Sequence, residues 1–169
     1  GFELRRVGMD TLASLAEQKR GAILLGAHFG SFEALRAGGK RTGARVNVVM
    51  DNRNAQRIRR FLHASSADGA VGILEVGDGG VDLVLRARDC IERGEFVAIL
   101  ADRVGEGQKA VRVPFLGGEV SLPAGPFLMA STLGCPVYLT LGAFRGGARY
   151  DLHCEPFAER IVLPRATRQ

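Results

Sequence analysis

One histidine in this sequence stands where an enzyme would place a general base. Residues 26–33 read GAHFGSFE, so that Glu33 follows His28 by five positions. If His28 lies in a turn before a helix, Glu33 in the first turns of that helix can reach its ring, and Gly30 lets the chain fold tightly. A carboxylate on one ring nitrogen fixes the tautomer and makes the other nitrogen more basic. Such a base is worth about 10²–10⁴ in rate.

The reaction open to this base depends on the nucleophile that it would activate. Ser31 is close in sequence, but GAHFGS lacks the G-x-S-x-G form of a nucleophile elbow. The base would therefore activate a hydroxyl of the substrate itself. The residues alone leave a second interpretation open, in which His28 caps a helix or is a core histidine with a structural role.

The segments around His28 indicate how it would be positioned. An apolar run at residues 21–27 predicts a buried strand that ends at His28. Apolar runs alternate with helical patterns downstream, which is typical of βαβ units and a mainly parallel sheet covered by helices on both faces. We predict one α/β domain over residues 1–169, with a C-terminal hairpin that turns at Gly146 and Gly147. Further strands are expected at residues 45–50, 71–76, 95–101, 111–116, 136–144 and 149–157, a loop at 104–110, and helices at 32–41, 55–64, 81–93 and 123–133, the last opened by Pro123.

The predicted sheet also indicates where a ligand would bind. In open α/β sheets, ligands bind beyond the carboxyl ends of the strands. Three polar clusters follow such ends in this sequence: His28 with Glu33, residues 51–53, and Asp102 with Arg103. We therefore expect the functional site at that edge of the sheet.

Composition limits the class of protein. The chain has 169 residues, 46% of them hydrophobic, which suits one domain with a sizeable core. Its three cysteines lack C-x-x-C spacing, which favours a reducing compartment and argues against a disulfide framework or a zinc site. No apolar stretch of about 18 residues is present, so a membrane span is not expected. The first residue is Gly1 rather than Met, which leaves open that the chain is a fragment whose missing ends carry an anchor.

The charge of the chain points to its partners. The formal net charge is +5 and most of the positive charge is arginine, which favours anionic partners such as lipid headgroups or an acidic protein, or reflects an arginine-rich proteome. Arg53, Arg57 and Arg60 would share one face of the helix predicted at residues 55–64. That face is either a docking surface or an ordinary solvated face. Nucleic-acid binding is not expected, because no recognition motif or aromatic platform is present.

Two regions carry a family resemblance. The first, GAILLGAHFGSFE at residues 21–33, joins an apolar strand to the pattern H-x4-E. The second, residues 99–157, has Asp102 after a strand, then V-x-F-x-G, Pro123 with Gly125, and G-x-P-V before a hairpin. Together they cover about half of the chain, in order. They resemble the lysophospholipid acyltransferase-like superfamily, and most closely its branch of bacterial lipid A late acyltransferases.

The resemblance implies transfer of an acyl group from a thioester of acyl carrier protein or coenzyme A to a hydroxyl of a lipid or glycolipid. His28 would deprotonate the acceptor, and Glu33 would orient the imidazole and stabilise its charged form. No metal or cofactor is implied. The implied location is cytoplasmic and peripheral at the inner face of the bacterial inner membrane, with an apolar rim and arginines around His28.

The resemblance also suggests substrate-binding residues. Relatives often carry an arginine after the second strand in a Tyr-Arg-Pro-like setting; here Met-Asp-Asn-Arg stands there, so Arg53 is the candidate for an oxyanion or phosphate contact. Relatives often have Gln after the aspartate that corresponds to Asp102, whereas Arg103 follows Asp102 in this chain. This difference predicts that the acceptor end of the site differs as well. The full set of expected substrate-binding residues is Arg53, Asp102, Arg103, Phe115, Gly117, Pro123 and Gly125.

Two other functions fit the same residues. One is a non-catalytic module of the same fold that binds an acyl carrier or lipid; the His28 and Glu33 pair argues against it. The other is a phosphate- or nucleotide-binding α/β enzyme that uses the turn at residues 26–31. That turn lacks both G-x-G-x-x-G and G-x4-G-K-[ST], which argues against the second alternative.

Overall fold

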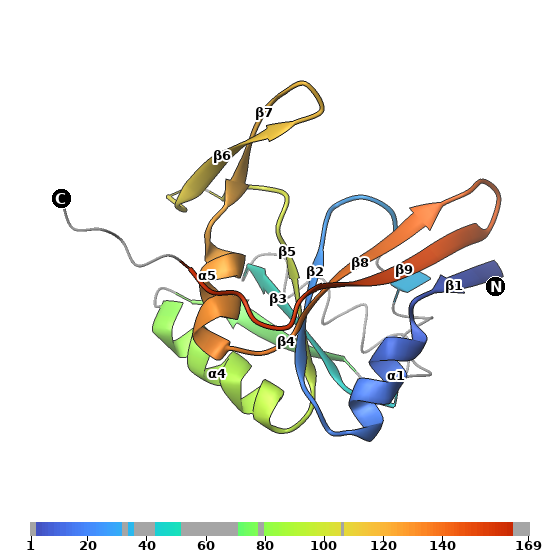
Figure 1. Cartoon of the computed structure of the whole chain (residues 1–169), viewed down its shortest axis with the longest axis horizontal. Helices are drawn as coiled ribbons and strands as arrows, with labels where there is room; N and C mark the ends of the chain where they lie inside the picture. Colours follow the sequence, from blue (N-terminus) through green and yellow to red (C-terminus); the bar gives the residue numbers. More distant parts are fainter. Residues whose placement is uncertain are drawn as a thin grey trace.

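A seven-stranded sheet forms the centre of the molecule (Figure 1). The computed structural model describes residues 3–31, 34–35, 43–51, 71–77, 80–105 and 107–163. The strands of this sheet are β1 (Glu3–Val7), β2 (Ala22–Gly26), β3 (Val46–Asp51), β4 (Val71–Val76), β5 (Phe96–Leu100), β8 (Val137–Phe144) and β9 (Arg149–Ala158). Their order across the sheet is β1-β9-β8-β2-β5-β3-β4. The predicted α/β class with a mainly parallel sheet is confirmed.

Five strands share one direction, and this determines where the site can lie. β2 pairs in parallel with both β5 and β8, and β3 pairs in parallel with β4 and β5. The carboxyl ends of these five strands therefore meet at one edge, which we call the carboxyl edge. β8 and β9 form the predicted antiparallel hairpin. Its turn contains Gly146 and Gly147, both with positive φ, as a tight hairpin turn requires.

β2 lies in the middle of the sheet and is buried on both faces. Successive side chains of a strand point to opposite faces, so Ile23 and Leu25 enter one core cluster while Ala22 and Leu24 enter the other. All four are buried. A strand that is buried on both sides cannot alternate between apolar and polar residues, which explains the continuous apolar run in this part of the sequence.

Helices cover both faces of the sheet, as predicted. α1 (Asp10–Glu17) packs Leu12 and Leu15 into the core on one face. α4 (Gly80–Glu92) and α5 (Gly125–Leu133) contribute Ala87 and Met129, among other side chains, to the core on the opposite face. Figure 1 shows α4 and α5 close together and α1 at the other end of the sheet. The central strands, which carry the site residues, are thus held between two apolar layers.

A separate two-stranded hairpin projects from the molecule between β5 and α5 (Figure 1). It consists of β6 (Ala110–Phe115) and β7 (Gly118–Pro123), which pair in antiparallel fashion. The prediction that Pro123 opens the following helix is wrong, because Pro123 is the last residue of β7 and pairs with Ala110. Pro126 instead occupies the first turn of α5, where the missing N–H of proline has no consequence.

The structure also differs from the prediction at the start of the chain. No element was predicted before residue 21, yet β1 and α1 lie there. β1 is a short edge strand with exposed Arg5 and Arg6, so it lacks a clear apolar pattern. Of the helix predicted at residues 32–41, only residues 34–35 are described, and they are helical. The helix predicted at residues 55–64 lies outside the described residues.

Candidate functional site

The register between β2 and β5 brings His28 and Asp102 together. Gly26, the last residue of β2, pairs with Leu100, the last residue of β5. The ladder continues one step further, because Ala101 N–H donates to the carbonyl of Gly26 at 3.0 Å. His28 and Asp102 each follow the Gly26–Leu100 pair by two residues. Two parallel strands that end in register therefore present these side chains next to each other at the carboxyl edge.

One carboxylate holds both the ring and the backbone of the histidine. His28 Nδ1 lies 2.9 Å from Asp102 Oδ1, and the backbone N–H of His28 donates to Asp102 Oδ2 at 3.0 Å. An ionised carboxylate can only accept, so Nδ1 carries the hydrogen of this bond, and in the neutral ring the lone pair is at Nε2. The side chains are 41% and 31% exposed, which leaves the ring accessible to a substrate. Chemically, this arrangement is suited to act as an oriented general base.

The pKa of the Asp102 carboxyl lies below its usual value. Partial burial acts to raise this pKa, but the hydrogen bonds from the ring and the backbone N–H of His28 outweigh burial. Asp102 is therefore ionised throughout the neutral range. A charged acceptor at Nδ1 also stabilises the imidazolium that forms when the ring takes up a proton.

The turn after His28 is pinned to the neighbouring strand β8. Gly30 forms a bridge with Gly142, and Ser31 N–H donates to the Gly142 carbonyl at 3.0 Å. Gly30 has a φ of +98°, and a Cβ at this position would overlap the carbonyl oxygen of Gly142. Only glycine fits both the conformation and the close approach. Gly30 and Gly142 thus set the path of the loop that carries His28.

Several neighbours of the pair in the sequence are exposed apolar residues. Phe29, next to the base, is 67% exposed, and Leu100 and Val104 on either side of Asp102 are also exposed. Arg103 is exposed as well and adds a positive charge beside them. Exposed apolar groups with an adjacent arginine suit an amphiphilic ligand that has an anionic head.

Four of the other predicted site residues belong to the β6–β7 hairpin and the start of α5. Phe115 ends β6 and Gly117 lies in the turn of the β6–β7 hairpin, whereas Pro123 ends β7 and Gly125 begins α5. Asp102, predicted to bind substrate, contacts the ring of His28. The expected partner of His28, Glu33, and the expected anion ligand, Arg53, both lie outside the described residues.

The contact between His28 and Asp102 was not predicted from the sequence, although a signal was present. The segments AILLGAH and FVAILAD both place a polar side chain two residues beyond a five-residue apolar strand. This equal spacing aligns the two side chains once the strands are neighbours in register. The sequence does not show which strands are neighbours, so the signal was not interpretable by itself.

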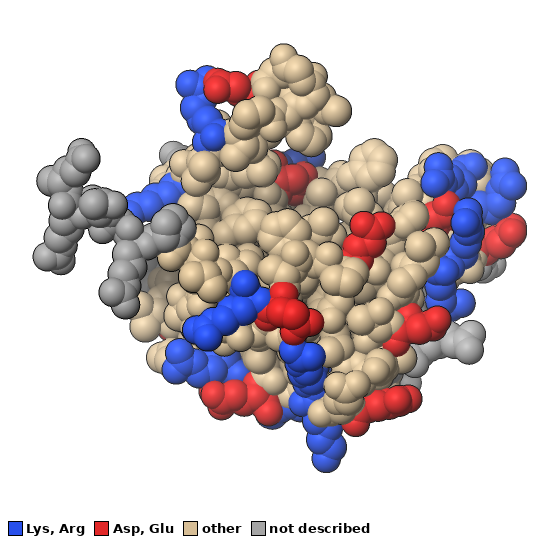
Figure 2. Space-filling view, viewed as in Figure 1, with Lys and Arg blue, Asp and Glu red and all other residues tan. Residues whose placement is uncertain are grey.

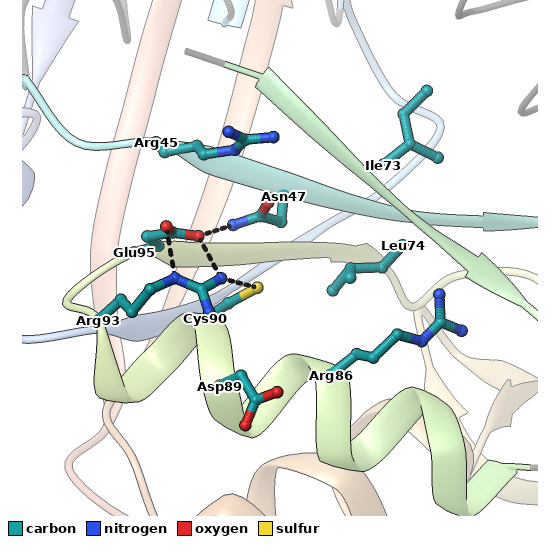
Figure 3. A pocket seen from close by; sticks show the side chains of 9 residues that line it. All are labelled: Arg45, Asn47, Ile73, Leu74, Arg86, Asp89, Cys90, Arg93 and Glu95. Carbon is teal, nitrogen blue, oxygen red and sulfur yellow. Dashed lines mark hydrogen bonds and ion pairs between the residues drawn. The ribbon is translucent and has the colours of Figure 1, made fainter. Parts of the chain in front are cut away.

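A cavity of about 410 Å³ lies at the opposite, amino-terminal edge of the sheet. Figure 3 shows Glu95 joined to Arg93 and Asn47 in this cavity, with Arg93 also reaching the sulfur of Cys90. The ion pair with Arg93, followed by Asn47, lowers the pKa of the Glu95 carboxyl despite its burial. The cavity is lined by Arg45, Asn47, Ile73, Leu74, Arg86, Asp89, Cys90, Arg93 and Glu95. These contacts join β3, α4 and β5, which is a structural role.

The cysteines are not candidate nucleophiles. Cys90, Cys135 and Cys154 are buried free thiols. Burial raises the pKa of each, to about 11 for Cys154, so all three remain protonated at neutral pH. Within the described ranges, no group of three or more His, Cys, Asp or Glu side chains is placed to hold a metal ion.

No helix in the part of the chain that the structure describes has the length and hydrophobicity needed to cross a membrane.

Comparisons with known proteins agree with the resemblance seen in the sequence. Residues 3–160 match the model of a protein family described as bacterial lipid A biosynthesis acyltransferase. The match covers nearly the whole chain, including every described strand and helix. A comparison with individual curated proteins gave no match.

Proposed function

Because this chain belongs to the bacterial lipid A biosynthesis acyltransferase family, we propose that it transfers a fatty acyl group from an acyl thioester to a hydroxyl of a lipid or glycolipid. The donor is acyl carrier protein or coenzyme A carrying the acyl group. The observation that supports this most directly is the oriented base: His28 with Asp102 at 2.9 Å from Nδ1. The proposed place of action is the cytoplasmic face of the bacterial inner membrane, which the protein contacts peripherally.

The proposed reaction uses the free nitrogen of His28. Nε2 removes the proton from the acceptor hydroxyl as its oxygen attacks the thioester carbonyl. Asp102 keeps the ring in the required tautomer and stabilises the imidazolium. The tetrahedral intermediate then collapses, the carbon–sulfur bond breaks, and the leaving thiolate takes the proton from Nε2. The products are an ester and a free thiol, and the base is restored without a covalent enzyme intermediate.

Other residues are proposed to bind the substrates. Glu33, five positions after His28 in the sequence, is proposed to add a second carboxylate that orients His28 and stabilises its charged form. Arg53 is proposed to face the oxyanion or a phosphate, and Arg103, exposed beside Asp102, to bind an anionic group of donor or acceptor. Phe115 and Gly117, together with Pro123 and Gly125, are proposed to border the acyl chain.

The test is an acyl-transfer assay with product identification. The protein is incubated with labelled acyl-carrier protein or acyl coenzyme A and with a bacterial lipid extract, and the acylated lipid is identified by mass spectrometry. We expect a product whose mass increases by one acyl group. His28→Ala should lower the rate by about 10² or more at matched folded fraction, because the acceptor hydroxyl then loses its proton without a base.

His153→Ala is the matched control, because His153 lies in β9, which β8 separates from β2. It should retain the wild-type rate. A folded His28→Ala protein with full activity would rule out this mechanism. An inactive wild type that still binds acyl carrier protein would support the scaffold alternative instead.

A further inference from the structure

The β6–β7 hairpin exposes apolar side chains at its projecting end. Leu116 is 91% exposed, the highest value for a large apolar side chain among the described residues, and Phe115 beside it is 59% exposed. Figure 1 shows the hairpin standing clear of the sheet, on the side toward which β2 and β5 end. The hairpin tip, which we define as residues 115–118, therefore extends beyond the edge that carries His28 and Asp102.

The backbone at the tip makes leucine an unexpected residue. Phe115 pairs with Gly118, so Leu116 and Gly117 form a two-residue turn with φ values of +48° and +82°. Asn, Asp and Gly are favoured at both positions of such a turn, because side chains beyond these rarely adopt positive φ. Leu116 has neither a favourable backbone conformation nor a buried environment. No interaction within the folded chain favours leucine at this position, which indicates a contact with another molecule.

The two faces of the hairpin differ in chemistry. The strand register places Val111 opposite Leu122 and Val113 opposite Val120, so one face is entirely apolar as far as Phe115. The other face carries the ion pair between Arg112 and Glu119, at 3.1 Å. Residues 113–118 contain no charged residue. Figure 2 shows the topmost surface of the hairpin without charge, and one blue and one red group beside it on the left.

We propose that the hairpin tip inserts into the hydrocarbon region of a lipid surface and turns the carboxyl edge toward it. A narrow, convex and uncharged tip enters a fluid apolar medium readily, whereas a protein partner would need a matching groove. Phe29, next to His28 in the sequence, is a further exposed apolar side chain. This inference rests on the proposed function, because it brings His28 to an acceptor that lies in the membrane.

Charge around the tip favours an anionic surface. Lys109 precedes the tip and is exposed, and Arg103 is an exposed neighbour of Asp102, whereas the charge of Arg112 is balanced by Glu119. The net charge of the chain is +5. Cations that flank an inserted apolar group lie at the depth of lipid phosphates, where each adds to the attraction. We therefore expect stronger binding to vesicles that contain phosphatidylglycerol than to vesicles of phosphatidylcholine alone.

The test is vesicle co-sedimentation of the whole chain carrying Leu116→Asn. Asparagine suits the turn better than leucine, so the melting temperature should stay the same or rise. Binding to vesicles of phosphatidylethanolamine and phosphatidylglycerol should weaken by about tenfold, because one leucine side chain no longer leaves water. Leu85→Asn, which changes an exposed leucine on α4, is the matched control and should bind like wild type.

Transfer assays separate this inference from the proposed function. Leu116→Asn should acylate a detergent-dispersed acceptor at the wild-type rate but a vesicle-embedded acceptor more slowly. His28→Ala should bind vesicles normally and acylate neither acceptor, because binding does not need the base. If the wild type binds vesicles but transfers no acyl group, the result counts only against the proposed function. Wild-type vesicle binding by Leu116→Asn would overturn the inference. The inference would also be overturned if Leu116→Asn lost as much transfer with the detergent-dispersed acceptor as with the vesicle-embedded acceptor and bound acyl carrier protein more weakly. That result would make the tip a protein-docking element.

Discussion

At the scale of single residues, the main feature is that one aspartate fixes one histidine twice. Asp102 accepts a hydrogen bond from the ring and another from the backbone N–H of His28. The first contact sets the tautomer, and the second holds the residue at the start of its turn. An asparagine could retain one of these bonds but not the negative charge, so the consequences of losing that charge can be measured separately.

Asp102→Asn should therefore lower kcat for acyl transfer by about 10²–10⁴ and change KM little, because the imidazolium loses its counter-ion and the tautomer is no longer fixed. Steady-state kinetics at matched folded fraction measures this. Glu33→Gln, measured alongside, should have the milder effect if Asp102 is the main partner of the ring. Asp89→Asn, at an exposed position on α4, should behave like wild type. Full activity of Asp102→Asn would show that the observed contact has no catalytic role.

At the scale of elements, a bridge between two glycines positions the loop that carries the base. The Gly30–Gly142 bridge ties the turn after β2 to β8. Gly30 has two separate reasons to be glycine, its φ of +98° and the closeness of the Gly142 carbonyl. Gly146, in the β8–β9 turn, has a φ of +96° but nothing within 4 Å of where its Cβ would be. The two positions differ only in the contact, which makes them a matched pair.

Gly30→Ala should lower the free energy of unfolding by more than Gly146→Ala does. Both substitutions carry the cost of alanine at positive φ, about 1–2 kcal/mol, but only Gly30→Ala must also displace β8 backbone. Gly30→Ala should in addition reduce acyl transfer at matched folded fraction, because the turn beside His28 shifts. Urea denaturation and the transfer assay measure the two effects. Equal stability and equal activity of the two variants would show that the bridge does not position the base.

At the scale of the whole molecule, the amino-terminal edge of the sheet contributes stability rather than chemistry. Glu95 connects Arg93 after α4 with Asn47 in β3, and it lies directly before β5. Asn47 is 4% exposed and also donates to the carbonyl of Phe96. β3, β5 and the end of α4 are thereby joined at one carboxylate, at the end of the strands opposite the carboxyl edge.

The contribution of these Glu95 contacts should appear in the pH dependence of the free energy of unfolding. The pKa of Glu95 is lower in the folded protein than its ordinary value, so ionised Glu95 stabilises the fold above the unfolded pKa of about 4.3. This contribution disappears as the pH falls through the folded value. In urea denaturation, wild type should therefore exceed Glu95→Gln in stability at pH 7, and the difference should shrink toward pH 3.

Two further variants control this prediction. Glu92→Gln, at an exposed position on α4, should follow wild type at each pH. Asn47→Ala should lower the free energy of unfolding by about 1–3 kcal/mol, because it removes a buried hydrogen-bond donor from Glu95. Acyl transfer by the folded fraction should be unchanged in all of these variants. A constant difference between wild type and Glu95→Gln from pH 7 to pH 3 would contradict the role assigned to the carboxylate.

The sequence by itself determined those features that depend on neighbours along the chain. Residues 71–76 were predicted as a strand and form β4, and the hairpin around Gly146 and Gly147 is where the glycines indicated. The α/β class follows from such local signals, because each apolar run and each turn is decided by a few adjacent residues. His28 was identified for the same reason: its strand, its glycines and its family pattern are contiguous.

The tertiary structure alone decided which distant residues meet. His28 and Asp102 are 74 positions apart, and they touch because β5, rather than β3, lies beside β2 in register. Strand order depends on how the apolar faces of all elements pack, which no local pattern records. The same reason explains why Pro123 ends strand β7 and does not open a helix: it pairs with Ala110 of β6. The exposure of Leu116 likewise depends on tertiary structure, because its hairpin projects from the core.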